Sequence, residues 1–484
     1  MSTSKPSPAS SPQMTSAQKN VALVVVLCMT FMEMLDTTIA NVALPTLQHA
    51  FDVDMALVQW VSSTFLVVSC AFLLTFGRLG DIVGKVRVFQ VGVATFTVGS
   101  VLSALAPSLP VLIAARAVQG LGVAASMANN QGIITEMFAE SRGRALGLMG
   151  TFTALGSMCG PTIGGAIVSV ASWRLIFLIN VPIGIISLLV GLKVLPNRRP
   201  AVKRHFDVKG AVLLSPAVLL FFAAITLMQK GFSPVQGIML AVAAVLLVLF
   251  VLVERREAEP LVSMGVFKNP GFDACLLTAV CVFLALSGIT IISPFYLQQA
   301  LGLAPGVAGA IVATYSLVNA IVGPLSGSIS DKIGCNIPVV AGAAIFSVGL
   351  ALFASLNLGT PVPLIVAIMM GTSLGTAIFQ APNNSLIMGH AKPEMLGFVG
   401  SLGNLMRYLG QSLGITVSMA LLYGNMSDVA GYRVTAYIPE RPDVFIVGMS
   451  RTYLILMGLV IVGIVITLVR IFVLDRREKD AQAH

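Results

Sequence analysis

The stretch VALVVVLCMTFMEMLDTTIANV, residues 21–42, decides the fold of this 484-residue chain. It is long enough to cross a bilayer as a helix, because a spanning helix needs about 20 apolar residues. Two carboxylic acids, Glu33 and Asp36, interrupt it. An ionisable group at membrane depth is costly, so such residues usually face a water-filled path or a partner and serve transport. At a spacing of three the acids share one helix face, which we interpret as the proton-handling wall of a transporter.

The composition is typical of a polytopic membrane protein. Hydrophobic residues make up 56% of the chain and charged residues 10%, against about 25% charged residues in an average soluble domain. Alternating ten-residue segments, which are typical of outer-membrane barrels, are not the pattern here, so we expect an all-α helical bundle. About fourteen apolar windows approach spanning length: 20–42, 57–77, 88–106, 110–134, 145–168, 174–195, 210–229, 235–253, 272–297, 306–328, 337–357, 361–387, 398–423 and 447–473.

The positive charge indicates membrane orientation. The formal net charge is +9, from 29 Lys and Arg against 20 Asp and Glu. With a cytoplasmic N-terminus, 22 of the 29 basic residues fall in or beside cytoplasmic segments, as the positive-inside rule requires. We therefore expect a multi-pass protein of the bacterial cytoplasmic (inner) membrane with both termini in the cytoplasm. Its expected surroundings are membrane lipids, and a nucleic-acid partner is excluded.

The ends of the chain and its cysteines carry no catalytic or metal-binding pattern. Residues 1–19 are rich in Ser and Pro and predict a disordered cytoplasmic tail. The first apolar segment is too long and too acidic for a cleaved signal peptide. No metal site or disulfide framework is expected from the unpaired spacing of the cysteines, which are Cys28, Cys70, Cys159, Cys275, Cys281 and Cys335.

A weak internal repeat divides the chain into two halves. The pattern Gly77, Leu79, Asp81 and Gly84 returns 250 residues later as Gly327, Ile329, Asp331 and Gly334. This repeat predicts related six-helix halves over 20–196 and 261–473, with a basic loop and two inserted helices over 197–260 and a tail over 474–484. The basic loop is interpreted as a solvated topology determinant, with lipid-headgroup binding as the alternative.

Four stretches carry a family resemblance. Leu35–Pro45 (LDTTIANVALP) resembles the first-helix motif of the drug:proton antiporters of the major facilitator superfamily, and Trp173–Gly184 (WRLIFLINVPIG) is similar to the sixth-helix motif of their fourteen-helix branch. Leu112–Ala125 and Gly156–Gly165 resemble the fourth-helix and fifth-helix motifs. The resemblance covers nearly the whole chain. It implies the major facilitator fold, driven by the proton motive force without a cofactor.

The loop after the second expected helix carries Gly77, Asp81, Gly84, Lys85 and Arg87. Glycine permits a tight turn, and the basic residues hold the loop at the headgroups. The resemblance implies a cytoplasmic gate in which Asp81 meets the positive N-terminus of the thirteenth helix. A purely topological loop is the alternative.

The fifth-helix motif combines small residues with a proline: Gly156, Gly160, Pro161, Gly164 and Gly165. Small residues at intervals of four let helices approach closely, and proline bends the axis. The resemblance implies a hinge and seal between the halves that favours export. Ordinary helix packing is the alternative.

Helix geometry places the acids opposite two residues of the fourth helix. The first helix is expected to run outward and to end near Val42. The fourth helix is expected to run inward from Pro110. At about 1.5 Å per residue, Asp36 and Arg116 then both lie about 9 Å below the outer end, and Glu33 lies level with Gln119. Because the resemblance implies that both helices line the central cavity, we expect Asp36 to approach Arg116 and Glu33 to approach Gln119.

These contacts divide the roles of the acids. Arginine stays charged and should keep Asp36 ionised, so Glu33, opposite a neutral amide, is the expected proton carrier. Asp36 is the expected coupling residue, released when substrate or a conformational change breaks its pair with Arg116. The alternatives are a structural Asp36 that only tethers its helix and a water-exposed Glu33 without a coupling role. We expect Glu33, Asp36, Gln119 and Asn383 to bind substrate.

Three further sets of residues need an explanation. Met29, Met32 and Met34 offer adaptable apolar surface if they line the cavity, with a core or lipid-facing position as the alternative. Arg407, in the thirteenth helix, has no mid-membrane acid in its own half and no assigned role. Amides at the cytoplasmic mouth either bind entering substrate or satisfy hydrogen bonds between helices: Asn129, Asn130, Gln131, Gln380, Asn383 and Asn384.

The leading hypothesis is a proton-coupled exporter of lipophilic, often cationic drugs that works by alternating access, and not an enzyme. Its partners would be small-molecule drugs and protons, with a periplasmic adaptor if the envelope is Gram-negative. A same-fold exporter of an endogenous metabolite, amino acid or siderophore is the alternative. An ATP-driven pump is disfavoured because the chain lacks a phosphate-binding Gly-x-x-x-x-Gly-Lys-Ser/Thr loop. A membrane sensor without transport is the third possibility.

Overall fold

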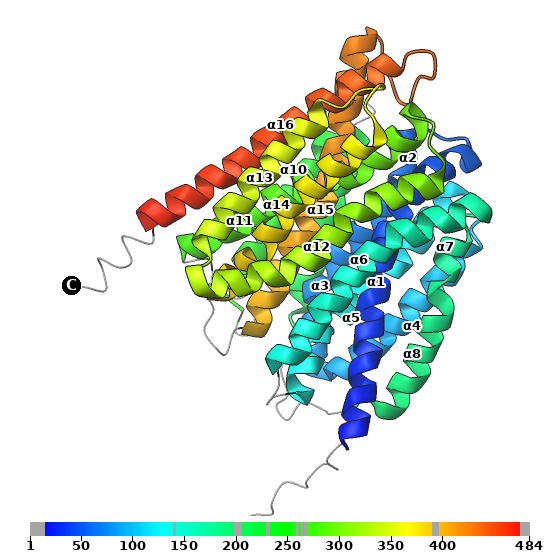
Figure 1. The fold of residues 1–484 in the computed structure, drawn as a ribbon. Helices are drawn as coiled ribbons and strands as arrows, with labels where there is room; N and C mark the ends of the chain where they lie inside the picture. The colour runs from blue at the N-terminus through cyan, green and yellow to red at the C-terminus, as the bar shows by residue number, and fades with distance from the viewer. Residues whose placement is uncertain are drawn as a thin grey trace, which may run out of the picture.

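The computed structural model describes residues 15–138, 142–196, 206–228, 233–257, 261–262, 265, 267, 269–389 and 396–474. The N-terminal half contains α1 (Ser16–Phe51), α2 (Met55–Val58), α3 (Trp60–Val83), α4 (Lys85–Ala104), α5 (Leu109–Met137), α6 (Arg142–Val170), α7 (Leu175–Leu178) and α8 (Asn180–Val194). The inserted pair is α9 (Val208–Met228) and α10 (Pro234–Glu254). The C-terminal half contains α11 (Pro270–Phe295), η3 (Tyr296–Ala300), α12 (Pro305–Ile333), α13 (Asn336–Ala354), α14 (Val362–Gly389), α15 (Leu396–Ala430), α16 (Pro442–Val469) and η5 (Arg470–Leu474) (Figure 1).

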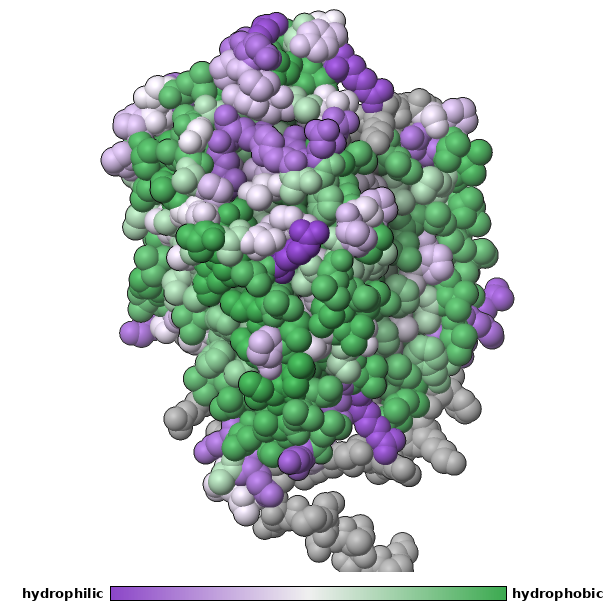
Figure 2. All heavy atoms as spheres, turned by 90° about the vertical axis from the view of Figure 1, so that its right-hand side faces the viewer, coloured by the Kyte–Doolittle hydropathy of each residue, from purple (hydrophilic) through white to green (hydrophobic). Residues whose placement is uncertain are grey.

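The expected membrane bundle is confirmed. Thirteen spans within the described residues are long and apolar enough to cross a membrane. The remaining expected span, the thirteenth in chain order, is α15, which has 35 residues but carries Asn404, Arg407 and Gln411 in its first half. Figure 2 shows most of the visible side surface as apolar, with hydrophilic residues gathered toward the two ends. This pattern is that of a protein whose sides face lipid.

The first helix is longer at both ends than its sequence window. α1 begins at Ser16 and runs to Phe51, beyond the expected limits of 20 and 42. Thr15 caps it, because its hydroxyl accepts from the Gln18 backbone N–H at 3.2 Å and its own N–H donates to the Gln18 side chain at 3.0 Å. Residues 16–19 therefore belong to the helix and not to a disordered tail. The other residues of the expected tails, 1–14 and 475–484, lie outside the described residues, as do Arg198, Arg199, Lys203 and Arg204 of the basic loop.

The two halves repeat the same backbone turn. Gly84 ends α3 with φ 114°, and Gly334 ends α12 with φ 84°. In each, the glycine N–H donates at 2.9 Å to the carbonyl four residues earlier, that of Gly80 or Ser330. Both φ values lie in a region that favours glycine. The predicted repeat therefore marks equivalent helix ends.

The repeat extends to a close helix crossing in each half. A Cβ atom at Gly92 of α4 would lie 2.7 Å from the carbonyl oxygen of Gly122 in α5. A Cβ at Gly342 of α13 would lie at the same 2.7 Å from the carbonyl oxygen of Gly375 in α14. Backbones that approach this closely need small residues on both helices. The two crossings are thus built from matching glycines.

The halves join along two helix pairs. α6 packs on α12, and α3 packs on α15. The inserted helix α9 contacts both α3 and α15, and the Ser215 hydroxyl of α9 donates to the Ala71 carbonyl of α3 at 2.9 Å. The inserted pair therefore lies alongside the second of these junctions.

Candidate functional site

The two acids of α1 are held inside the N-terminal half. Glu33, Asp36 and Arg116 are all 0% exposed. α1 packs against α5, α6 and α8 of its own half and also contacts α11 of the other half, while the hydrogen-bond partners of both carboxyls come from the N-terminal half. Burying charge in a protein interior is costly unless it is paired. Asp36 is paired with an arginine, whereas Glu33 has a single hydrogen bond from a neutral serine.

Asp36 forms the expected ion pair with Arg116. One Asp36 carboxyl oxygen accepts from the Arg116 guanidinium. The other accepts from the Asn180 amide of α8 at 2.7 Å and, weakly, from the Gln119 amide at 3.4 Å. The prediction that these two charged residues meet is confirmed. Three helices, α1, α5 and α8, meet at this one carboxylate.

The arginine of this pair is fixed on all sides. Its Nε donates to the Val61 carbonyl at 2.9 Å. Its guanidinium carbon lies 4.2 Å from the ring centroid of Phe65 and 5.6 Å from that of Phe177. Aromatic faces attract a desolvated cation. Arg116 is therefore held in place by backbone, rings and the Asp36 carboxylate together.

Gln119 belongs to the Asp36 network and not to Glu33. Its side-chain oxygen accepts from Arg116 at 2.8 Å and from the Ser103 hydroxyl at 3.1 Å, and its amide donates to the Ser100 hydroxyl at 2.8 Å. The expected approach of Glu33 to Gln119 is wrong. Gln119 instead links α5 to α4.

Glu33 meets a different residue of α5. The Ser126 hydroxyl donates to one Glu33 oxygen, and the second oxygen is buried without a hydrogen-bond partner. The physical reason is the lean of side chains toward the N-terminus of their helix. α1 and α5 run in opposite directions, so Glu33 leans toward Ser126 while Gln119 leans the other way, toward Asp36.

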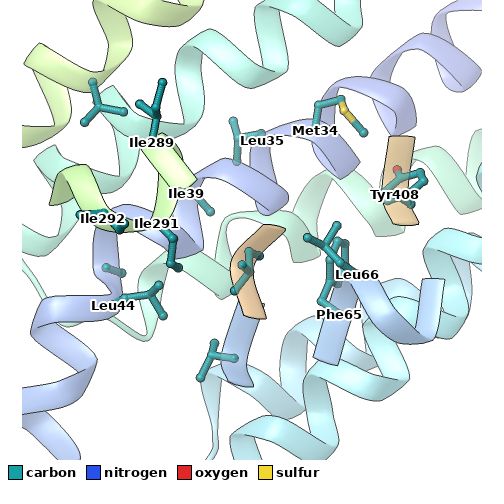
Figure 3. Packing of buried hydrophobic residues seen from close by; sticks show 14 of the residues in the cluster. Met34, Leu35, Ile39, Leu44, Phe65, Leu66, Ile289, Ile291, Ile292 and Tyr408 are labelled. Atoms are coloured by element: carbon teal, nitrogen blue, oxygen red, sulfur yellow. The ribbon is translucent and has the colours of Figure 1, made fainter. Parts of the chain in front are cut away.

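Apolar side chains surround the acids. Met29, Met32 and Met34 are 0%, 1% and 6% exposed, which places them inside the protein and not on the lipid surface. Figure 3 shows Met34 and Leu66 near Tyr408, which comes from α15 of the other half. The Tyr408 hydroxyl contacts the sulfur of Met127 on α5. A side chain of the C-terminal half thus reaches the region of Glu33.

Lys85 organises the loop for which a gate role is predicted. The Lys85 ammonium lies 2.6 Å from a carboxyl oxygen of Glu136 and 3.7 Å from one of Asp81. It therefore ties the end of α3 to the inner end of α5. The expected partner of Asp81, the start of the thirteenth helix near Gly397, has its side chains outside the described residues, so this expectation stays a prediction.

One face of the fifth-helix motif packs within its own half. A Cβ at Gly156 would lie 2.4 Å from the carbonyl oxygen of Phe31, and one at Gly160 would lie 2.9 Å from that of Leu35. Gly164 lies against Ile39 in the same way. The three glycines allow α6 to lie directly on the acid-bearing part of α1.

A second face of the motif contacts the other half. A Cβ at Gly165 would lie 2.6 Å from the Pro305 carbonyl oxygen, and one at Gly309 would lie 2.3 Å from the Pro161 carbonyl oxygen. The Gly306 N–H donates to the Ser169 hydroxyl at 2.7 Å. The motif therefore packs its own half and also adjoins α12, and its role as a hinge and seal stays a prediction.

The halves also touch where α1 and α11 finish, which we call the outer end. Gln298 donates to the Val42 carbonyl at 3.0 Å, and Gln299 donates to the Gln48 side chain at 2.7 Å. Together with the contact between α6 and α12, these bonds join the two halves near the outer end.

Two of the six amides expected at the cytoplasmic mouth, Asn129 and Asn130, form hydrogen bonds within the protein. Asn129 donates to the carbonyls of Ala125 and Phe76 at 2.9 and 3.3 Å, and Asn130 donates to the Thr30 hydroxyl at 3.1 Å. Asn383 is 2% exposed and its side-chain oxygen has no hydrogen-bond partner. The structure brings neither Asn383 nor Arg407 into the Asp36 network.

Sequence reasoning missed three contributors to the site. Asn180, Ser126 and Ser100 supply hydrogen bonds but carry no charge that marks them in an apolar window. Asn180 stands within the sixth-helix motif, and its position two residues before Pro182 was the available signal. The two serines are common residues of packed membrane helices and had no distinguishing signal.

Comparisons with known proteins agree with this architecture. Residues 26–415 match the family model described as Major Facilitator Superfamily. The chain is 29% identical to the riboflavin transporter RibZ of Clostridioides difficile (strain 630), over 96% of this chain and 99% of the relative. It is 31% identical to the multidrug resistance protein Stp of Mycobacterium tuberculosis (strain CDC 1551 / Oshkosh), over 85% and 77%.

A solved structure shares the fold. A bacterial homologue of the human lysosomal transporter Spinster, in an inward-facing and unoccupied conformation, superposes with a TM-score of 0.67 at 15% identity. The match covers 94% of this chain and 97% of the other. At this identity the likeness concerns the arrangement of helices alone.

Proposed function

The chain belongs to the major facilitator superfamily and is a multi-pass membrane transporter rather than an enzyme, and on that premise we propose that it exports lipophilic, often cationic drugs in exchange for protons. The observation that carries the proposal is the enclosed acid pair of α1. Glu33 is fully buried with one unpartnered carboxyl oxygen, and Asp36 is bound to Arg116. The similarity to a protein named for multidrug resistance supports the choice of drugs as substrates.

The two acids have separate roles in this proposal. A fully buried carboxyl that has a single hydrogen bond is costly to keep charged, which suits Glu33 to take up and release a proton. Asp36 is held by Arg116, Asn180 and Gln119. It couples proton movement to substrate when the halves rearrange and its bonds are broken.

The contacts between the halves suggest how access alternates. The glycine face of α6 lies on α1 beside the acids, and its other face meets α12 near the outer end. A movement of the halves that separates α6 from α12 therefore also changes the surroundings of Glu33 and Asp36. We assign the hinge and seal to this motif, and the gate on the opposite side to the loop with Asp81 and Lys85.

The proton motive force is a sufficient energy source. One proton that enters down about 100 mV supplies roughly 2.3 kcal/mol. This energy supports a gradient of about fiftyfold for a neutral solute at one-to-one exchange. No bound cofactor is needed. We place the protein in the bacterial cytoplasmic membrane with both termini inside, where a Gram-negative envelope would add a periplasmic adaptor as partner.

Transport in proteoliposomes tests the proposal. A pH-sensitive dye reports proton movement when a lipophilic cation such as tetraphenylphosphonium is added. We expect cation-driven proton release in the wild type and its loss in Glu33→Gln and Asp36→Asn. Glu440→Gln, which neutralises an exposed acid, is the matched control and should behave as the wild type. Full coupling in both acid variants would end the proposal.

An endogenous metabolite is the second candidate substrate. The similarity to a riboflavin transporter along 96% of this chain favours it. Competition assays separate the two functions, because a metabolite exporter should prefer one compound over all tested drugs. A drug exporter should instead show several competitors of similar strength.

A further inference from the structure

A polar stripe on α15 faces the boundary between the two halves. Asn404, Arg407 and Gln411 follow Gly400 at intervals of four, three and four residues, so all four lie on one helix face. A Cβ at Gly400 would lie 3.0 Å from the Gln131 side-chain oxygen of α5 in the other half. The stripe therefore points toward the N-terminal half and away from lipid.

The charge of this stripe lies at mid-membrane depth. Arg407 is eleven residues into α15, which begins at Leu396. At about 1.5 Å per residue, its Cα lies about 16 Å from the helix start. This distance is close to half of the roughly 30 Å hydrocarbon thickness. A cation at this depth needs either water or an anion.

Arg407 has no acid as a partner. Within the described part of the chain no carboxylate forms an ion pair with it, and its Nε is buried without a hydrogen bond. Its guanidinium carbon lies 5.5 Å from the ring centroid of Tyr408. Its side chain also hydrogen-bonds to Tyr408. Neither contact supplies a negative charge, and an aromatic face compensates poorly for a missing counter-ion, so the partly buried guanidinium keeps at least its Nε–H as an unused donor.

The region that Arg407 faces is also the region of Glu33. The Tyr408 hydroxyl is within electrostatic range of both the Arg407 guanidinium and the Glu33 carboxyl, and it touches Met127 of α5. Figure 3 places Tyr408 near Met34, the residue that follows Glu33. A positive group without an acidic partner from one half and a protonatable group from the other thus approach the same space.

We propose that Arg407, with Asn404 and Gln411 beside it, binds an anionic group of the transported solute. The planar guanidinium matches a carboxylate or phenolate bidentately, and the two amides add neutral donors. The inference rests on the proposed export function and widens its substrates from lipophilic cations to acids with an apolar body. The methionines near Glu33 provide adaptable surface for that body.

The charge of the solute determines how its transport rate should depend on the membrane potential. Exchange of one proton for one monovalent cation is electroneutral. Exchange of one proton for one monovalent anion moves two positive charges inward, so an imposed inside-negative potential should accelerate acid export specifically. A merely structural arginine would not create this difference.

Matched solutes and matched variants test the proposal in proteoliposomes. The solutes are a fluorescent aromatic carboxylic acid, its neutral methyl ester and tetraphenylphosphonium. We expect Arg407→Gln to lower the ratio of acid transport to cation transport at least tenfold, and Arg407→Lys to restore part of it. Arg451→Gln, which removes an exposed arginine of α16, should leave the ratio as in the wild type.

Each other outcome overturns this inference or the function beneath it. If wild type moves the cation but not the acid, or if Arg407→Gln lowers all three solutes equally, Arg407 does not bind anions. Acid export that is insensitive to membrane potential would overturn the inference as well. If wild type moves no solute against a proton gradient, the proposed function itself has failed.

Discussion

Asp36 and Arg116 form a buried ion pair in the N-terminal half. Each is fully buried, and each satisfies the other's charge. Removing one partner of a buried ion pair typically costs about 3–5 kcal/mol, because the remaining charge stays buried and unpaired. The pair should therefore respond to substitution as a unit.

A double-mutant cycle tests this coupling. Arg116→Met should lower the thermal unfolding temperature in detergent strongly, because Asp36 then lacks its cation. Arg116→Met combined with Asp36→Asn should be less damaging than the sum of the single changes. Additive losses would show that the two side chains are energetically independent.

Asn180 should matter through a single hydrogen bond. Its amide donates to Asp36 at 2.7 Å in a site with no exposure. Asn180→Leu keeps the branched shape and the number of heavy atoms but removes the donor, which costs about 1–3 kcal/mol at a buried polar group. We expect a lower unfolding temperature and slower transport. Asn180→Thr retains a donor, so its unfolding temperature and transport rate should lie between those of the wild type and of Asn180→Leu. Identical behaviour of the Leu and Thr variants would exclude the hydrogen bond as the cause.

At the level of helices, α6 depends on glycine only where it meets another backbone. A Cβ at Gly156 would lie 2.4 Å from the Phe31 carbonyl oxygen, whereas a Cβ at Gly150 of the same helix would meet nothing within 4 Å. Alanine favours a helix over glycine by about 1 kcal/mol. Whether a glycine-to-alanine substitution in α6 raises or lowers stability therefore depends on how closely a neighbouring helix approaches that position.

The two glycines form a matched experiment. Gly156→Ala should lower the unfolding temperature and impair transport, since it forces α6 away from the acid-bearing part of α1. Gly150→Ala should be neutral or slightly stabilising. Equal effects of the two substitutions on unfolding temperature would contradict the close approach of α6 to α1.

For the whole molecule, alternating access requires that the junction near the outer end opens. Gly306 of α12 and Ser169 of α6 lie on opposite sides of it, and a Cβ at Gly306 would lie 3.7 Å from the Ser169 Cβ. Disulfides form readily at a Cβ separation of about 3.5–4.5 Å. A cysteine pair at these positions should therefore bridge the halves.

Locking the junction should stop transport reversibly. We expect Ser169→Cys with Gly306→Cys to lose transport after oxidation and to regain it after reduction. Each single variant, oxidised in the same way, controls for the native cysteines. Undiminished transport by a fully cross-linked sample would rule out separation of α6 from α12 as part of the cycle.

The sequence by itself determined the membrane bundle, the two related halves and the meeting of Asp36 with Arg116. Apolar length predicts a spanning helix, and a constant rise per residue converts sequence position into relative depth. The family resemblance supplied the remaining premise, that the first and fourth helices line one cavity. The end of α1 was misplaced, yet the pairing of Asp36 with Arg116 is confirmed, because a long arginine side chain tolerates an error in depth.

Only the tertiary structure decided which neutral residues complete the site. Ser126 as the partner of Glu33, Asn180 as the partner of Asp36, and the approach of Tyr408 and Arg407 from the other half all depend on helix rotation and on the direction in which side chains lean. Depth along an axis does not specify either quantity. They are set by how glycine-lined helices pack against one another, which is a property of the assembled bundle.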